Sequence, residues 1–105
     1  MNYKYYNPRK AALDTLTGAL NAAVADGSLP EAPLPEFIVE IPADVKNGDI
    51  ASNAAMAGAR AFNKAPRQIA QAIVDHLNLE GSLFDRVEIA GPGFINLFLG
   101  AHWFT

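Results

Sequence analysis

The chain has 105 residues, half of them hydrophobic and 18% charged, which predicts one ordinary globular domain rather than a disordered segment. Its formal net charge of -3 disfavours strong autonomous binding to RNA or DNA, but does not exclude a module that adds a few contacts to a larger interface. The chain has no cysteine, no signal core and no run of about 18 apolar residues, so we expect a soluble cytoplasmic protein without disulfides, thiolate zinc sites or membrane contact.

The first part of the chain predicts a helix, a loop and a strand. Residues 7–26 predict the helix, because leucine and valine recur at helical spacing, Pro8 suits the first turn and Gly27 suits the end. Three prolines within residues 28–36 predict an extended loop. Residues 37–41, FIVEI, predict the strand from their β-branched and apolar content.

The middle of the chain predicts a turn followed by two helices. Residues 42–53 are typical of a turn without a strand of its own. Residues 54–64 predict a short alanine-rich helix, which either Ser52 or Asn53 could cap. A further helix is expected over residues 66–78, because it begins with proline and carries isoleucine and leucine every fourth residue.

The last third of the chain predicts a β-hairpin. Residues 84–90 alternate between apolar and charged side chains, and residues 94–99 return antiparallel after the Gly91-Pro92-Gly93 turn. The resulting order α-β-α-α-β-β predicts the α+β class. We expect a two-layer domain in which a small antiparallel sheet has its helices packed on one face.

The Gly91-Pro92-Gly93 stretch also raises the possibility of a phosphate-binding loop. Such a loop needs backbone N–H groups that converge at the start of a helix, often with a lysine. Here Pro92 removes one N–H group, a strand follows instead of a helix, and no Lys-Ser/Thr pair is adjacent. We therefore interpret the stretch as a hairpin turn.

The strand over residues 94–99 has two different faces. Alternation places its aliphatic residues on the core side and two aromatic rings flanking an amide on the opposite side, namely Phe94, Asn96 and Phe98. Bases stack on aromatic rings for about 1–3 kcal/mol each, and an asparagine amide can pair with a base edge. This set could read an unpaired nucleotide. The residues alone leave open that both rings are structural and that Asn96 bonds locally.

Three cations lie close together in the sequence, at Arg60, Lys64 and Arg67. Their spacing places them near one helical face, although Pro66 interrupts the register between the two helices. They could contact a phosphate backbone. The alternative is a solvated basic edge without a ligand.

The sequence gives little sign of catalysis. His76 and His102 have no metal-ligand spacing to a partner, and His76 suits a structural position near a helix C-terminus. Asp44 and Asp49 flank a turn, where turn or capping roles suit them better than acid–base chemistry. No serine lies in a nucleophile-elbow pattern. We expect no metal site and no catalytic residue.

Four short motifs follow one another in a characteristic order. They are Gly48-Asp49, Asn53–Met56, Pro66–Ala70 and Ala90–Asn96. With this order and spacing, the chain closely resembles the N-terminal domain of bacterial arginyl-tRNA synthetases, over roughly residues 8–104.

The resemblance implies an α+β additional domain that precedes a class I catalytic domain of the Rossmann type and contacts the D-loop at the elbow of arginine tRNA. Phe94 and Asn96 match the aromatic-x-Asn/Gln pattern that faces the D-loop base in this family, so the resemblance favours recognition over a structural role for this pair. The Gly91-Pro92-Gly93 turn is then expected to aim Phe94 and Asn96 outward. The parent enzyme is implied to join arginine to its tRNA with ATP and Mg²⁺.

The family's catalytic signatures, a His-x-Gly-His type motif and a Lys-Met-Ser-Lys-like loop, occur nowhere in this sequence. We therefore expect residues 1–105 to be a non-catalytic fragment without a cofactor of its own, cut before the catalytic domain. Its expected partners are arginine tRNA and the catalytic and anticodon-binding domains of the same chain. The alternative is a domain that packs on neighbouring domains and orients them, with incidental RNA contact. An independent small-molecule enzyme has no support in the sequence.

Overall fold

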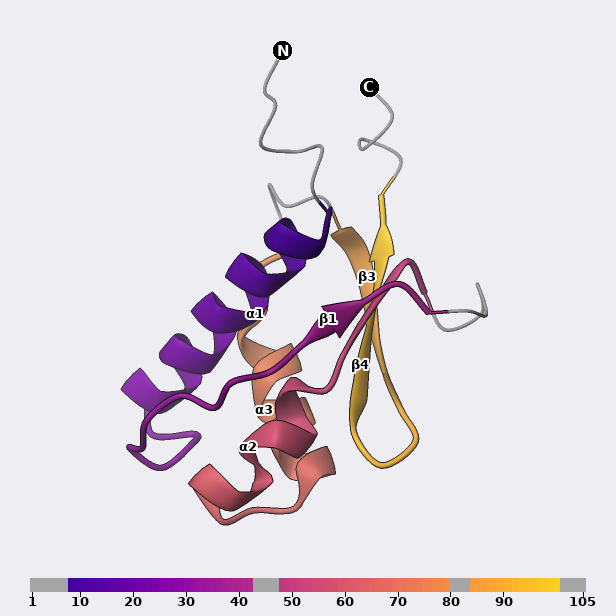
Figure 1. The fold of residues 1–105 in the computed structure, drawn as a ribbon. Helices are drawn as coiled ribbons and strands as arrows, with labels where there is room; N and C mark the ends of the chain where they lie inside the picture. The colour runs from indigo at the N-terminus through magenta and orange to yellow at the C-terminus, as the bar shows by residue number, and fades with distance from the viewer. Residues whose placement is uncertain (1–7, 43–47, 80–83, 101–105) are drawn as a thin grey trace.

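The computed structural model describes residues 8–42, 48–79 and 84–100 (Figure 1). Within these residues the chain forms three helices and four strands. In order they are α1 (Pro8–Ala25), β1 (Val39–Glu40), β2 (Ile50–Ser52), α2 (Ala54–Phe62), α3 (Pro66–His76), β3 (Phe84–Ala90) and β4 (Phe94–Leu99). The predicted α+β class is confirmed.

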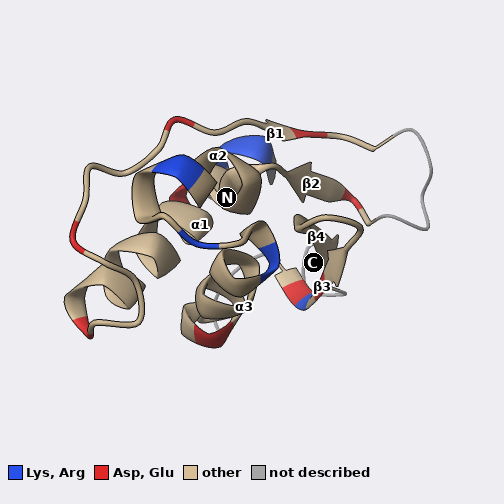
Figure 2. Ribbon diagram, turned by 90° about the horizontal axis from the view of Figure 1, so that it is seen from below, with Lys and Arg blue, Asp and Glu red and all other residues tan. Residues whose placement is uncertain are grey.

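The strands form one antiparallel sheet in the order β1-β2-β4-β3. All the helices lie on one side of this sheet, as Figure 2 shows, with α1 against β1 and β2, α2 against β4 and α3 against β3. The expected two-layer arrangement is therefore present. Among the described residues, no helix covers the opposite face of the sheet.

The helices form where periodicity and end signals predicted them. In α1 one face is fully buried, while Gly27 ends the helix with φ of +87°, a backbone conformation that glycine adopts without strain. Helix α2 ends in the same way at Asn63, with φ of 52°. Among the described residues, no helix has the length and hydropathy that a membrane span requires.

Two predictions about the first half of the sheet are wrong. The strand expected over residues 37–41 is reduced to β1, and residues 50–52, expected to be a turn, form β2. Strand β2 exists because it lies between two partners, with Ala51 opposite Glu40 on β1 and Ile50 opposite Leu97 on β4. Backbone pairing on both sides outweighs the weak strand tendency of three residues.

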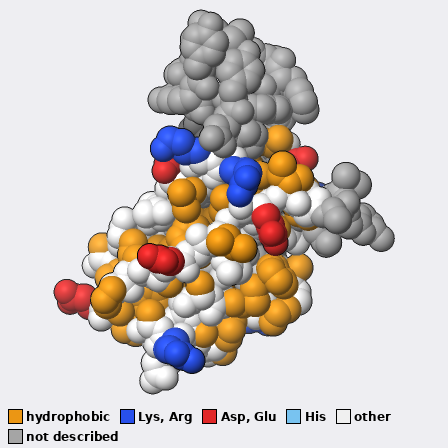
Figure 3. All heavy atoms as spheres, viewed as in Figure 1, with side chains coloured by type: hydrophobic (Ala, Val, Ile, Leu, Met, Phe, Trp, Pro, Cys, Tyr) orange, Lys and Arg blue, Asp and Glu red, His pale blue; other side chains and the backbone are white. Residues whose placement is uncertain are grey.

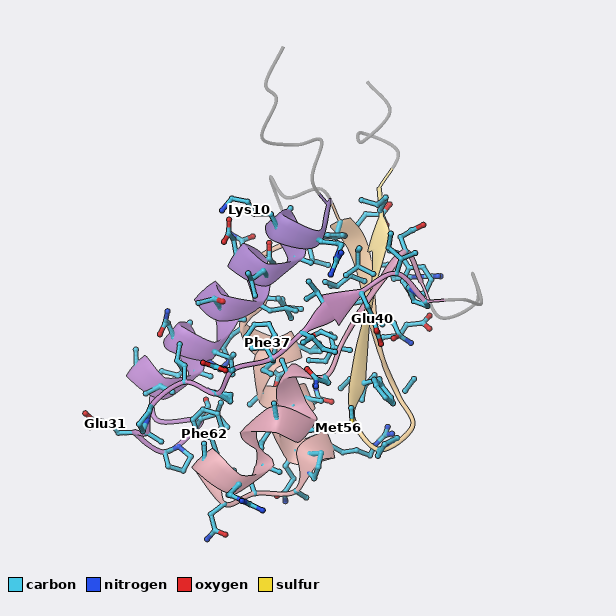
Figure 4. All side chains as sticks on the ribbon, in the orientation of Figure 1. Lys10, Glu31, Phe37, Glu40, Met56 and Phe62 are labelled. Carbon is cyan, nitrogen blue, oxygen red and sulfur yellow. The ribbon has the colours of Figure 1, made fainter. Side chains whose placement is uncertain are left out.

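The hydrophobic core lies between the helices and the inner face of the sheet. Phe62 of α2 is buried, and a Cβ atom added to Gly58 would lie 3.0 Å from its ring, so glycine is what allows this close packing. Figure 4 shows Phe62 together with Phe37, which precedes β1 and is half-buried against the core. The fully buried large side chains of the layer are Leu16, Leu20, Leu29, Ile50, Ile69, Ile73, Phe84, Ile95 and Leu97.

Candidate nucleic-acid interface

The pairing register assigns side chains to the two faces of the sheet, because residues directly opposite one another share a face. Ile95 and Leu97 of β4 are fully buried on the helical side. We call the opposite side the outer face. It consists of Glu40, Ala51, Arg86, Glu88, Ala90, Phe94, Asn96 and Phe98.

Phe94 is the exposed aromatic residue of the outer face. It is the first residue of β4, directly after the turn, and it is 39% exposed. A Cβ atom added to Gly91 would lie 3.8 Å from the ring, so the backbone of the turn lies alongside it. The ring therefore stands at the tip of the hairpin, where it can meet a flat ligand.

Asn96 lies on the outer face, as alternation predicts, but it is not freely exposed there, because it is only 3% exposed. Strand β4 is flanked on both sides, so Ala51 and Glu88 stand beside Asn96 on this face. The backbone before β2 covers it further, because a Cβ atom added to Gly48 would lie 3.5 Å from the Asn96 Cβ atom. Asn96 can present no more than an edge to a ligand.

Phe98 is half-buried, and a cation lies over its ring. The guanidinium carbon of Arg86 is 3.9 Å from the ring centroid. The Arg86 Nε atom is also 3.7 Å from a carboxylate oxygen of Glu88. Arg86 was not among the predicted site residues, because only the pairing register, with Arg86 opposite Phe98, brings the two together.

The hairpin turn is fixed to the start of α3. Gly93 has φ of +141°, and a Cβ atom at this position would lie 3.0 Å from the Pro66 side chain. The Arg67 guanidinium donates a hydrogen bond to the Gly91 carbonyl. The turn is thus held by close backbone approach and by one charged donor, and it leads into β4 with Phe94 at its start.

The three predicted cations are all exposed and come from one corner of the fold. Arg60 lies in the last turn of α2, Lys64 in the connection to α3, and Arg67 in the first turn of α3. This connection and the hairpin turn lie at the same end of the molecule (Figure 1). Figure 2 shows blue segments along the connection and at the start of α3. Of the three, Arg67 bonds directly to the turn.

The Gly48-Asp49 motif fastens the chain to β4. The Asp49 backbone N–H donates to the Leu97 carbonyl at 2.9 Å, and its carboxylate accepts from the Leu99 N–H at 2.8 Å. Gly48 has φ of +93°, and a Cβ atom there would lie 2.9 Å from the Leu97 carbonyl oxygen. Asp49 has the structural role expected of it, whereas Asp44 lies outside the described residues.

The start of the Asn53–Met56 motif joins α2 to the segment before β1. The buried Ser52 hydroxyl donates to the Ile38 carbonyl at 3.0 Å and accepts from the Ala54 N–H at 3.1 Å. The Asn53 side chain accepts from the Ile38 N–H at 2.8 Å and makes no cap bond to α2. Of the two candidates for the cap, Ser52 is therefore the one that satisfies a helix N–H group.

His76 belongs to an ion pair between helix ends. Its Nδ1 atom is 2.7 Å from the Ala72 carbonyl oxygen and its Nε2 atom is 2.5 Å from the Asp26 carboxylate. The hydrogen bond to Asp26 raises the pKa of His76, and the bond from His76 lowers the pKa of Asp26 to about 2. Among the described residues no group of three or more acids or histidines is placed to hold a metal ion. His102 lies outside them.

Residues 13–99 match the family model of the arginyl tRNA synthetase N terminal domain. The chain belongs to this family. An arginine–tRNA ligase of Symbiobacterium thermophilum is 53% identical over 88 residues, which are 84% of this chain and 16% of the relative. An arginine–tRNA ligase of Acetivibrio thermocellus is 40% identical over 95 residues, 90% of this chain and 17% of the relative.

The chain thus spans a small part of the curated relatives that it matches, 17% and 16% of their lengths. A crystal structure of arginyl-tRNA synthetase from Plasmodium falciparum has the same fold, with a TM-score of 0.60 at 18% identity. The match covers 83% of this chain and 16% of that one. The expected membership of the family is confirmed.

Proposed function

We propose that this domain contacts the D-loop at the elbow of arginine tRNA, as part of an arginyl-tRNA synthetase. The observation that carries the proposal is Phe94, an aromatic ring that is 39% exposed at the tip of a hairpin fixed to α3. An unpaired base gains about 1–3 kcal/mol from stacking on such a ring. Because Pro66 and Arg67 already hold the turn in place, little ordering of the protein opposes that gain.

Asn96 and the corner cations have supporting roles in this proposal. The nearly buried Asn96 amide meets only the edge of a base that is already stacked on Phe94. Asn96 therefore distinguishes one base from another and adds little to the affinity. Arg67, Lys64 and Arg60 lie at the same end of the fold and contact the phosphate backbone beside that base. With a net charge of -3, the domain adds contacts to an interface that other domains dominate.

The chemistry of aminoacylation belongs to other domains in this proposal. The parent enzyme joins arginine to its tRNA, with ATP and Mg²⁺ bound at its catalytic domain. This domain itself needs no cofactor. Its partners are arginine tRNA and the catalytic and anticodon-binding domains of the same polypeptide.

The test is an NMR titration of the isotope-labelled chain with an arginine tRNA transcript. We expect shifts centred on residues 91–98 that fade when the D-loop base is changed. Phe94→Ala should weaken binding by about 1–3 kcal/mol. Leu13→Ala is the matched control, because Leu13 is also 39% exposed but lies on α1. Equal affinities for the two variants, or indifference to the D-loop base, would overturn the proposal.

A second candidate function is packing against neighbouring domains, which exposed isoleucines at the β1 edge of the sheet favour. Ile38 and Ile41 flank β1 and are 58% and 72% exposed. The surface in Figure 3, seen from the side on which β1 lies in front, carries many hydrophobic side chains among scattered charges. In the parent enzyme, Ile38→Ser with Ile41→Ser would then lower thermal stability, with discrimination among D-loop bases unchanged. Unchanged stability would exclude this packing role.

A further inference from the structure

Phe98 does not offer its ring face to a ligand in the way that Phe94 does. The Arg86 guanidinium carbon lies 3.9 Å above its centroid, well within the range of a cation–π contact. A base approaching from the side of Arg86 would meet the guanidinium plane first. The Arg86 side chain is 59% exposed, so this plane is accessible from solvent. Guanidinium planes, like aromatic rings, accept unpaired bases by stacking.

Arg86 lies on the same face as Phe94, at the other end of β4. It is opposite Phe98, four residues along the strand from Phe94. At about 3.3 Å per residue this separation is about 13 Å. Nucleotides stacked at roughly 3.4 Å would cover it in about four steps. One RNA strand laid along the hairpin could therefore reach both positions.

The charges around Arg86 favour stacking over simple attraction to phosphate. Glu88 is 3.7 Å from the Arg86 Nε atom, and Asp85 precedes it on β3 with its side chain exposed. These carboxylates offset the positive charge and repel a phosphate. They do not impair the planar face, and contact with Phe98 and Glu88 reduces the freedom that Arg86 would lose on binding.

We propose that Arg86, stacked on Phe98, is a second nucleotide-stacking platform of the outer face, an inference that rests on the proposed contact with tRNA. Phe94 holds one unpaired base at the hairpin tip, and Arg86 holds another nucleotide of the same RNA further along the strands. Phe98 acts beneath Arg86 as a positioning residue and does not itself touch the RNA.

The test compares Arg86→Lys with Arg86→Gln in titrations of the 105-residue chain with the arginine tRNA transcript. Lysine keeps the charge but lacks the plane, so both variants should weaken binding on the order of five-fold or more, and by similar factors. The effects of Phe98→Leu and Arg86→Lys should not add, because each removes the same platform. The Arg86 Nε–H signal should shift on titration of the wild-type chain.

Three outcomes separate the inference from the function on which it rests. If Phe94→Ala weakens binding while both Arg86 variants bind like wild type, the platform is overturned and the tRNA contact stands. If Arg86→Lys binds like wild type while Arg86→Gln does not, Arg86 acts as a charge on phosphate and the inference again fails. If neither Phe94→Ala nor the Arg86 variants change the affinity, both the platform and the proposed contact with tRNA are overturned.

Discussion

The two ends of α3 hold neighbouring elements by different means. At its start, Pro66 packs against Gly93 of the hairpin turn, and Arg67 bonds to the Gly91 carbonyl. At its end, His76 pairs with Asp26, which follows α1. The first junction depends on the packing of the Gly93 backbone against the Pro66 ring and on an arginine guanidinium, which keeps its charge. The second depends on a histidine and a carboxylate, whose charges change with pH.

This difference separates the part of the fold that positions the proposed interface from the part that only joins helices. The hairpin carries Phe94 and Arg86, and its described contacts with the start of α3 are made by a glycine, a proline and an arginine. The pair of Asp26 and His76 lies at the opposite end of α3. We therefore expect changes in pH to alter the helix junction and to leave the hairpin in place.

The largest expected effect is at Gly93. In Gly93→Ala, the new Cβ atom would meet Pro66 at 3.0 Å in a residue with φ of +141°, which costs about 2–4 kcal/mol through overpacking and backbone strain. Urea unfolding should show this loss as a lower midpoint with an unchanged slope. The tRNA affinity of the folded protein should fall as well, because the turn no longer aims Phe94.

Two other glycines serve as controls for Gly93→Ala. Gly91→Ala, in the same turn, has φ of +55° and open space apart from the Phe94 ring at 3.8 Å, so it should cost only about 1 kcal/mol. Gly18→Ala on α1 meets nothing within 4 Å and should stabilise the protein by about 0.5–1 kcal/mol. If Gly93→Ala were as mild as Gly91→Ala, the fit against Pro66 would not hold the turn.

The helix junction should give a smaller effect that depends on pH. Folding raises the pKa of His76 above 6.5, so protonated His76 stabilises the folded state through its bond to Asp26. This contribution is fully present below pH 6.5 and is lost as the pH rises through the raised pKa. Because the pKa of Asp26 is lowered from 3.8 to about 2, its stabilisation is present above pH 3.8 and is lost as pH falls toward 2. In urea titrations, the free energy of unfolding of His76→Gln should therefore fall less than that of the wild type as the pH rises above 6.5.

Matched carboxylate variants identify the partner of His76. Asp26→Asn should remove most of the same pH dependence, because the bond to Asp26 is the largest cause of the raised pKa of His76. Adding His76→Gln to it should then change little further. Asp75→Asn removes a carboxylate that neighbours His76 in sequence and accepts from Gln71, so it should leave most of the dependence intact. A wild-type pH profile that survives Asp26→Asn would contradict the assignment.

The sequence predicts the helices and the β3–β4 hairpin well because each has local end signals. Proline at residues 8 and 66 begins two helices, and the Gly91-Pro92-Gly93 turn separates two strands that the structure places at the predicted residues, 84–90 and 94–99. These signals act within a few residues and do not depend on the remainder of the fold. Alternation also assigned the side chains of β4 to the correct faces.

The failures concern contacts between distant residues. Strand β2 exists through pairing with β1 and β4, and its three residues have no distinctive pattern. Alternation could place Asn96 on the outer face but could not show that Ala51, Glu88 and the backbone at Gly48 crowd around it there. Two further contacts also depend on the tertiary fold and cannot be found from local patterns. They are the contact of Arg86 with Phe98 and the ion pair of His76 with Asp26, 50 residues away.

The smallest expected effect on stability is at Arg67. It tests whether Arg67 contacts RNA phosphate in addition to holding the hairpin turn. Arg67→Gln removes an exposed bond to the Gly91 carbonyl and should cost less than about 1 kcal/mol, equally at pH 6 and pH 8. If Arg67 also contacts phosphate, the slope of log affinity against log salt should fall by about 1. Arg60→Gln, an exposed residue of the same corner, shows whether any cation there has this effect. If Arg67→Gln leaves the salt slope unchanged and the small loss of stability is present, Arg67 serves the turn alone. Stacking of bases on the hairpin is then the main source of this domain's own affinity for RNA.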